Sequence, residues 1–340
     1  MSVGMSEPLL RVRDLRVEFQ LARGTLRAVD GVSFDVHPGE SLGLVGESGS
    51  GKTVALRALV GLLPRTARIT GGTVEIDGVD VSSASEARRR ELRGTTVSMI
   101  FQEPMTALNP VMRVGEQIAE TPLVRLGQSR REAKPRALEL MRLVGIPDPT
   151  RRAEAYPHEL SGGMRQRVMI AIALSGNPRL ILCDEPTTAL DVTIQDQILK
   201  LLQQLQRELD VALVFVSHDL AVVAQTSRRV AVMYAGQIVE QGAVADVFRE
   251  PRHPYTLGLM RSVPDFDAVR ETLTAIPGAP PDLASPPRGC RFHPRCQFVQ
   301  TDCLEGEIPL IELGGDCAAR CLHHDQVALD VRREPVIADG

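Results

Sequence analysis

No stretch of this 340-residue sequence is apolar for long enough to cross a membrane. The longest uninterrupted apolar run, from Val168 to Leu174, is far shorter than the ~20 residues that a spanning helix needs. The N-terminus also lacks the apolar segment that a signal peptide carries. We therefore expect neither a membrane span nor a secretion signal in this chain.

Excess positive charge is also absent, because the formal net charge is −4. The charge balance thus gives no general reason to expect nucleic acid as a partner. Only three of the 39 basic residues are lysines, namely Lys52, Lys134 and Lys200. A lysine that falls in a functional motif is therefore informative.

Cysteine is nearly absent from most of the chain, where Cys183 stands alone, and the other five cysteines all follow residue 289. A cytosolic chain has little use for disulfides, so this cluster suggests a metal or cofactor site. The length suggests two domains, or one large domain with an extension. With 43% hydrophobic and 24% charged residues, the composition is that of a globular protein.

Alternating apolar residues predict strands within residues 9–36, followed by a short apolar strand over residues 41–45. Residues 53–63 have one apolar face and predict a helix, and residues 74–78 predict a strand that enters a turn. From about residue 86 to residue 174 the pattern is helical, with several prolines as breaks.

Strands return at residues 180–183 and 211–216, on either side of a helix predicted for residues 192–209. This alternation indicates an α/β protein with a mainly parallel sheet. Ala235 and Gly236 form the predicted turn of a later hairpin. Residues 277–287 hold five prolines and read as a stiff linker before the cysteine-rich segment.

The strongest motif is a phosphate-binding loop between a predicted strand and a predicted helix. Its sequence is Gly46-Glu47-Ser48-Gly49-Ser50-Gly51-Lys52-Thr53, which fits G-x-x-x-x-G-K-[ST]. Glycines allow backbone N–H groups to turn toward phosphates, and the helix N-terminus adds the positive end of its dipole. Lys52 would reach the β- and γ-phosphates of ATP, and the Thr53 hydroxyl would coordinate Mg²⁺.

A second motif places two carboxylates, Asp184 and Glu185, at the end of the apolar strand that begins at Leu180. Asp184 would hold Mg²⁺ through water, and Glu185 would polarise the water that attacks ATP. An acidic pair after a strand is weak evidence alone, but the phosphate loop precedes it in the chain.

A third motif, Leu160-Ser161-Gly162-Gly163-Met164-Arg165-Gln166, resembles the signature motif of ATP-binding cassette (ABC) transporter ATPases. Ser161 is a good N-cap, and Gly162 and Gly163 open a helix whose free N–H groups can receive phosphate. The resemblance implies that this helix end, with Gln166, caps the γ-phosphate of ATP bound on a partner subunit.

The resemblance extends to four isolated residues. Gln102 corresponds to the Q-loop glutamine that contacts Mg²⁺ and water and responds to the membrane subunits. Asp191 falls in the D-loop at the dimer contact, and His218 matches the switch histidine that contacts the γ-phosphate. Phe19 corresponds to the aromatic residue that stacks on adenine.

The resemblance covers about residues 8–325 and narrows to the ATPases of dipeptide and oligopeptide importers. Three strings carry this narrower likeness: Phe101-Gln102-Glu103-Pro104-Met105-Thr106-Ala107-Leu108-Asn109-Pro110, His253-Pro254-Tyr255-Thr256, and Gly289-Cys290-Arg291-Phe292-His293-Pro294-Arg295-Cys296.

The resemblance implies a P-loop NTPase core with an antiparallel β subdomain and an inserted helical subdomain. We expect the nucleotide-binding domain over residues 8–250, with the helical subdomain at about residues 100–175. A connecting segment over residues 251–288 and a cysteine-rich extension over residues 289–325 follow, with a tail over residues 326–340.

The cysteine spacing by itself leaves the ligand open. Zinc sites usually begin with two close ligands, which only Cys317 and Cys321 provide, whereas iron–sulfur clusters accept varied spacing. The resemblance implies a [4Fe–4S] cluster on Cys290, Cys296, Cys303 and Cys321, with Cys317 left over. Zinc, metal-free thiols, and His293, His323 or His324 as ligands remain alternatives. Cys183 is expected in the core.

The predicted function is that of an ATP-hydrolysing subunit, which energises peptide import through ATP-driven closure of two ATPase subunits. The resemblance implies a second ATPase subunit, for which we expect a heterodimer, together with two permeases and an extracytoplasmic peptide-binding protein. The chain would then be a peripheral subunit on the cytoplasmic side of the cell membrane. Nickel, glutathione or another peptide-like cargo, a soluble non-transport ABC ATPase, and a regulatory module that binds nucleotide without hydrolysis remain alternatives.

Overall fold

The computed structural model describes residues 7–22, 24–188, 190–262 and 275–333. The chain divides into two compact units, each built from separate stretches of sequence. Among the described residues, the first unit contains those of 7–10, 35–40 and 75–215, and the second contains those of 11–34, 41–74 and 216–333.

Parallel strands at the centre of the first unit carry the acidic motif. β6 (Val97–Ile100) runs parallel to β7 (Leu180–Asp184), and the strand order here is β8-β7-β6, with β8 over Ala212–Ser217. Every residue of β7 and β8 is buried, as expected for parallel strands covered on both faces. Cys183 on β7 is fully buried, which confirms its prediction as a core residue.

The prediction of a continuous helical pattern from residue 86 to residue 174 is wrong at β6, which interrupts it. A four-residue segment is too short to show a periodicity of its own, and here pairing with β7 decides its conformation. α2 (Glu86–Leu92) precedes this strand.

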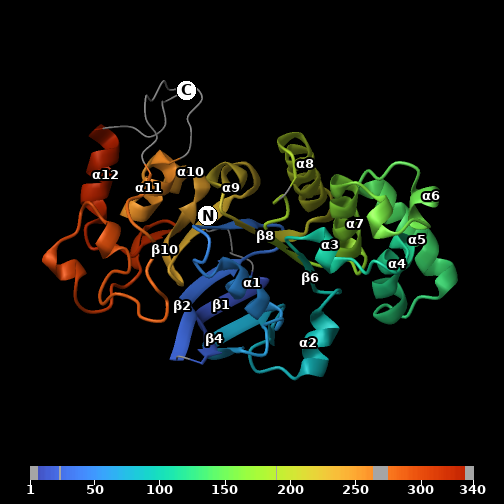
Figure 1. Ribbon diagram of the computed structural model, residues 1–340, viewed down its shortest axis with the longest axis horizontal. Coiled ribbons are helices and arrows are strands. Elements are labelled where there is room, and N and C mark those ends of the chain that lie inside the picture. The colour runs from blue at the N-terminus through green and yellow to red at the C-terminus, as the bar shows by residue number, and fades with distance from the viewer. Residues whose placement is uncertain (1–6, 23, 189, 263–274, 334–340) are drawn as a thin grey trace. The chain divides into compact units, whose positions relative to one another are not determined.

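The predicted helical subdomain follows β6 and is coloured from teal through green to olive in Figure 1. Its helices are α3 (Pro104–Ala107), α4 (Val114–Val124), α5 (Arg130–Leu143), α6 (Pro149–Ala153), the short 3-10 helix η1 (Pro157–Glu159) and α7 (Gly162–Leu174). α4 and α5 pack through fully buried side chains such as Ile118 and Met141. The predicted helix after β7 is α8 (Val192–Leu209), with one buried face.

The second unit contains the N-terminal strands β1 (Leu10–Leu21), β2 (Gly24–Val36) and β4 (Ala67–Ile76), in the order β2-β1-β4. The strands expected within residues 9–36 are present as β1 and β2, which have 12 and 13 residues. In the first unit, β5 (Val79–Asp80) pairs antiparallel with the last two residues of β4.

A second sheet of this unit carries the phosphate loop, with strand order β11-β12-β10-β9-β3. β3 (Ser41–Val45) runs parallel to β9 (Arg229–Tyr234), and β9 forms a hairpin with β10 (Gln237–Ala243). Both turn residues of this hairpin, Ala235 and Gly236, have positive φ, which confirms the predicted turn. The surrounding helices are α1 (Lys52–Leu59), α9 (Leu220–Thr226) and α10 (Val244–Arg249).

The C-terminal residues are part of the same sheet and core. β12 (Cys317–Ala319) pairs with β10 and with β11 (Ile311–Gly314). α11 (Pro254–Arg261) packs against α12 (His324–Arg333). Residues 326–333 of the predicted tail are thus helical. The short 3-10 helices η2 (His293–Arg295) and η3 (Thr301–Cys303) lie in the cysteine-rich extension. Within the described residues, no helix has the length and apolar character needed to cross a membrane.

Gly176, just after α7, provides a test of the packing in the first unit. A Cβ on this residue would lie 1.6 Å from the carbonyl oxygen of Gly94, so Gly176→Ala forces backbone apart. We expect a loss of about 3 kcal/mol or more in the free energy of unfolding, measured by urea denaturation.

Gly127→Ala is the matched control, because Gly127 has a φ of 65° and no atom within 4 Å of the added Cβ. The backbone strain of alanine at this φ predicts a loss of about 1 kcal/mol in the free energy of unfolding. Equal losses in the two variants would contradict the close approach at Gly176.

Candidate functional site

The phosphate loop lies between the end of β3 and the start of α1, and close contacts require its glycines. Gly51 has a φ of 103°, and a Cβ there would lie 2.3 Å from the carbonyl oxygen of Ala28. A Cβ on Gly46 would lie 2.1 Å from the carbonyl oxygen of Met233. Gly49, with a φ of 80°, has open space around it. The loop therefore has one packed side and one open side.

The Lys52 side chain makes hydrogen bonds to three residues of the same loop. Its Nζ donates hydrogen bonds to the carbonyl oxygens of Gly46 at 2.7 Å and Glu47 at 2.9 Å, and to Ser50 Oγ at 3.3 Å. The lysine and Ser50 are buried, whereas Ser48 and Gly49 are exposed and Thr53 is half-buried. A cation held against a glycine-rich loop at the start of a helix fits the binding of phosphate groups.

Two residues far along the chain fix Glu47 in this loop. Its backbone N–H donates a hydrogen bond to Tyr255 Oη at 2.7 Å. Its carboxylate accepts two hydrogen bonds from Arg295, at 2.8 Å and 3.1 Å. Sequence reasoning missed both partners, although they lie in two strings that it had singled out, because no local pattern relates them to the loop.

The acidic motif brings two predicted residues into contact in the first unit. Glu185 Oε2 accepts hydrogen bonds from Gln102 Nε2 at 3.1 Å and from Thr188 Oγ1 at 2.9 Å. Asp184 is fully buried at the end of β7, and Glu185 has a φ of 45°. A left-handed conformation is costly for a residue other than glycine, and such conformations cluster at functional sites.

The signature segment begins α7 as predicted. Ser161 is the N-cap, and its Oγ accepts a hydrogen bond from the backbone N–H of Met164 at 3.4 Å. A Cβ on Gly163 would lie 2.8 Å from Ile194 Cγ2 on α8, so this position favours glycine. Ser161 and Gly162 are exposed and Gln166 is buried, which leaves the helix start open to a ligand.

The remaining predicted nucleotide contacts lie at element ends or on a strand. Asp191 is exposed, and its carboxylate caps α8 by accepting a hydrogen bond from Ile194 N at 3.0 Å. His218 is exposed directly after β8. Phe19 is half-buried on β1, unlike the fully buried Val17. Their roles toward nucleotide stay predictions.

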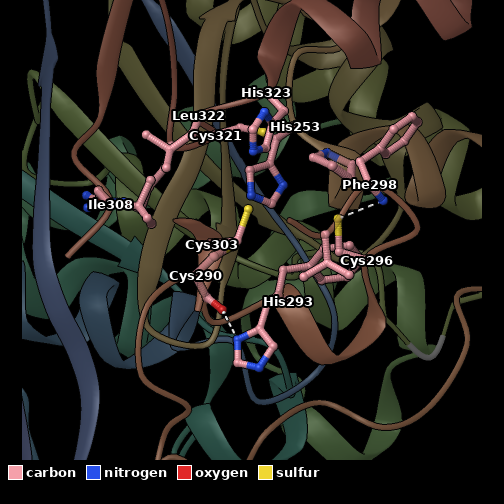
Figure 2. Close-up of a pocket in the computed structure, with 14 residues that line it drawn as sticks. His253, Cys290, His293, Cys296, Phe298, Cys303, Ile308, Cys321, Leu322 and His323 are labelled. Atoms are coloured by element: carbon pink, nitrogen blue, oxygen red, sulfur yellow. Dashed lines mark hydrogen bonds between the residues drawn. The ribbon is translucent and has the colours of Figure 1, made fainter. Parts of the chain in front are cut away.

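Four of the five C-terminal cysteines line a single small pocket, shown in Figure 2. These are Cys290, Cys296, Cys303 and Cys321. Cys317 lines a different pocket and lies beside Gly242. The hydrogen bond from Cys290 N to the carbonyl oxygen of Cys303, at 2.9 Å, ties two parts of the four-cysteine pocket together.

Burial disfavours the thiolate form in this pocket. It raises the pKa of Cys296 to about 11 and that of Cys321 to about 12, and neighbouring sulfurs add to both shifts. Burial also raises the pKa of Cys290. Four thiols that line one pocket are a donor set that fits a metal cation, which stabilises thiolates and displaces their protons.

Histidines also border the four-cysteine pocket. His293 and His323 line it, and in Figure 2 the ring of His253 lies there as well. His323 Nε2 lies 2.9 Å from Asp302 Oδ1, and together with Cys303 this pair could offer three ligand atoms to a metal ion. His324 is not among the residues that line the pocket.

Comparison with known families gives two matches. The model described as "ABC transporter" matches residues 29–188. The model described as "Oligopeptide/dipeptide transporter, C-terminal region" matches residues 239–303. The phosphate loop and the acidic motif lie in the first match, and Tyr255, Arg295 and three pocket cysteines lie in the second.

Two curated relatives cover most of the chain. The oligopeptide transport ATP-binding protein OppD of Bacillus subtilis is 49% identical over 307 residues, which are 90% of this chain and 86% of that protein. A putative peptide import ATP-binding protein of Brucella melitensis is 49% identical over 334 residues, covering 95% of this chain and 99% of that one.

Among solved structures, the ATP-binding cassette MJ0796 in a dimeric post-hydrolysis state with ADP and Pi matches with a TM-score of 0.63 and 27% identity. The match covers 69% of this chain and 98% of MJ0796. CbiO1 of Clostridium perfringens, part of an ABC transporter complex, matches with a TM-score of 0.61 and 25% identity, over 72% of this chain and 91% of that one.

The Lys52 contacts generate a binding prediction. Lys52→Ala removes the cation from the loop, and we expect ATP affinity to fall at least about 100-fold, since a charge-assisted contact to phosphate is lost. Titration with a fluorescent ATP analogue and Mg²⁺ measures the change. Lys200→Ala is the control, because Lys200 is an exposed residue on α8 that pairs with Asp196. Equal affinities of the two variants would contradict the assignment of Lys52.

Proposed function

The chain belongs to the family of ABC transporter ATP-binding proteins that includes the peptide import ATPases, and from this premise we propose that it energises import of di- and oligopeptides. The observation that carries the proposal is the presence of both matches in one chain: a nucleotide-binding region and the C-terminal region of oligopeptide and dipeptide transporters. Two relatives whose names refer to peptide transport or import support it, because each matches this chain over most of its length.

For nucleotide binding, we assign the loop from Gly46 to Thr53 to the phosphates of ATP. Backbone N–H groups and the Lys52 ammonium group bind the β- and γ-phosphate oxygens. Thr53, Gln102 and Asp184 are the proposed ligands of Mg²⁺, which supplies neutralisation of phosphate charge. Phe19 is the proposed stacking partner of adenine.

For hydrolysis, Glu185 is the proposed general base. Its carboxylate takes a proton from the attacking water, and the hydrogen bonds from Gln102 and Thr188 hold it in a fixed orientation. His218 is the proposed contact to the γ-phosphate. The electron pair freed from the water O–H bond attacks phosphorus, and ADP leaves with the electrons of the broken P–O bond.

For coupling, we propose that Ser161, Gly162, Gly163 and Gln166 cap ATP held by a second ATPase subunit, with Asp191 at the contact between subunits. ABC ATPases dimerise, and MJ0796 was solved as a dimer. We propose a heterodimer with a different ATPase subunit. Closure on ATP would switch the transmembrane pair from inward- to outward-facing, and hydrolysis would reset it.

We propose that two separate permease subunits anchor this chain at the cytoplasmic face of the cell membrane. The helical subdomain offers a docking surface: a groove of about 570 Å³ bordered by α4, α5 and α6. Leu123 and Val124 line it together with charged residues such as Arg113 and Glu116. Val124 is 65% exposed, so this surface suits an amphipathic segment of a permease.

Cargo within this class is the finer part of the proposal. We favour di- and oligopeptides because the relatives with 49% identity are described as oligopeptide or peptide transport proteins. Nickel and glutathione are the competing cargoes, since an extracytoplasmic binding protein and the permeases select cargo. Uptake of radiolabelled peptide, glutathione and nickel by cells with and without this chain separates these cargoes.

We further propose a [4Fe–4S] cluster on Cys290, Cys296, Cys303 and Cys321. The supporting observation is that these four thiols share one pocket from which Cys317 is separate. A cluster would supply the cationic iron that stabilises four thiolates in one pocket, and such clusters are commonly held by four cysteines. Zinc is the competing metal.

The assignment of Glu185 predicts a separation of binding from hydrolysis. Glu185→Gln should bind ATP but lower turnover at least about 100-fold, as expected for loss of a general base. The assay is phosphate release by the assembled transporter. Glu208→Gln is the control, because Glu208 is exposed on α8. Unchanged turnover in Glu185→Gln would remove this residue as the base.

The cluster assignment predicts iron and colour in protein purified without oxygen. We expect four iron atoms per chain and a broad absorbance band at about 400 nm. Cys303→Ser should lose both, whereas Cys317→Ser should keep them, because Cys317 lines another pocket. A colourless protein loaded with zinc would contradict the assignment.

A further inference from the structure

Glu47 places a carboxylate inside a loop whose proposed task is to bind phosphates. ATP brings several negative charges to this loop, and the Glu47 side chain is only partly exposed, at 27%. A carboxylate at this point repels the ligand unless its charge is neutralised, and partial burial weakens solvent screening. The loop therefore needs a cation that pairs with Glu47.

Arg295 of the cysteine-rich extension provides that cation. Its guanidinium group makes two hydrogen bonds to the two carboxylate oxygens of Glu47, at 2.8 Å and 3.1 Å. The Arg295 side chain is 4% exposed, so this pair is largely shielded from water. Paired hydrogen bonds of this kind are stronger and more directional than a single contact.

The surroundings of Arg295 hold its guanidinium group in one place. Its Nε donates a hydrogen bond to the carbonyl oxygen of Pro277 at 2.8 Å, and its Nη1 donates one to Tyr234 Oη at 3.3 Å. The centres of the Tyr234 and Phe292 rings lie 5.7 Å and 5.8 Å from the guanidinium carbon. The cation is thus preorganised, and lysine could not reproduce its planar contacts.

Glu47 is also held at its backbone from the same part of the chain. Tyr255 is fully buried at the start of α11, and its hydroxyl accepts the hydrogen bond from Glu47 N at 2.7 Å. The Tyr234 and Tyr255 rings lie 4.5 Å apart, and Phe292 completes this aromatic cluster. Side chain and backbone of one loop residue are therefore fixed from segments more than 200 residues away.

We propose that Arg295 is a positioning residue for ATP: it neutralises Glu47 and thereby sets the affinity of the phosphate loop for nucleotide. This inference rests on the proposed binding of ATP by that loop. It gives the cysteine-rich extension a role in the nucleotide site that is independent of any metal. A purely structural Arg295 would instead stabilise the fold without acting through the charge of Glu47.

A role through the charge of Glu47 and a purely structural role predict different results in a double-substitution experiment on the full chain. Arg295→Met leaves Glu47 charged and unpaired, and we expect the Kd of a fluorescent ATP analogue with Mg²⁺ to rise about tenfold or more, as one uncompensated charge near phosphate predicts. Glu47→Gln combined with Arg295→Met removes the repulsion, and its Kd should return to within about threefold of the wild-type value.

Two arginines of the same extension are the controls. Arg288 is exposed, and Arg288→Met should leave the Kd unchanged. Arg291 is buried and pairs with Asp30, so Arg291→Met disturbs the same extension at another carboxylate. Adding Glu47→Gln to Arg291→Met should bring no recovery, because the charge of Glu47 remains neutralised by Arg295 in that variant.

An unchanged Kd in Arg295→Met, or a double variant as weak as Arg295→Met, would overturn the inference. Circular dichroism and thermal unfolding identify a variant that fails to fold. In that case Arg295→Lys decides, because it keeps a positive charge near Glu47 but loses the paired hydrogen bonds. A Kd within about threefold of the wild-type value, or a larger rise that Glu47→Gln reverses, would support a role through charge. A larger rise that Glu47→Gln leaves in place would overturn it.

The same titration distinguishes a failure of the role of Arg295 from a failure of the proposed ATP site. If wild-type protein and Lys52→Ala bind the analogue equally, the proposed ATP site itself fails. If Lys52→Ala loses binding while Arg295→Met matches the wild type, only the role of Arg295 fails.

Discussion

The placement of the phosphate loop is the constraint on which the second unit depends. The loop packs between β2 and the turn of the β9–β10 hairpin: Gly236 N donates to the carbonyl oxygen of Ser50 at 2.9 Å, and Asp30 N donates to that of Gly236 at 2.8 Å. The space left beside Gly51 admits no Cβ. A loop fixed on one side leaves its other side free for a ligand, with little reorganisation on binding.

The C-terminal extension contributes to that constraint. β12 pairs with β10, and Arg291 contacts both Asp30 and the carbonyl oxygen of Ala235 beside the loop. Arg295 then contacts the loop itself. The four-cysteine pocket is built from the same segment, so a metal bound there would stabilise the residues that hold the loop. This gives a physical reason for a metal site in an ATPase subunit without assigning it any redox chemistry.

Features with local causes could be predicted from the sequence. The phosphate loop, the N-cap at Ser161, the hairpin turn at Ala235 and the helix over 192–209 each follow from neighbouring residues. β6 escaped prediction because its conformation comes from pairing with β7. The contact between Glu47 and Arg295 could not be predicted, because 248 positions separate the two residues and no local sequence pattern indicates such a contact. Likewise, spacing alone did not separate Cys317 from the other four cysteines, whereas packing does.

The central claim is that ATP hydrolysis by this chain energises peptide import. The most direct measurement is uptake of a labelled oligopeptide into proteoliposomes that contain the permeases, both ATPase subunits and the peptide-binding protein. The account predicts uptake that requires ATP and this chain and that stops with a non-hydrolysable ATP analogue. Uptake at the same rate without this chain, or ATP hydrolysis with no peptide movement in the complete complex, would contradict it.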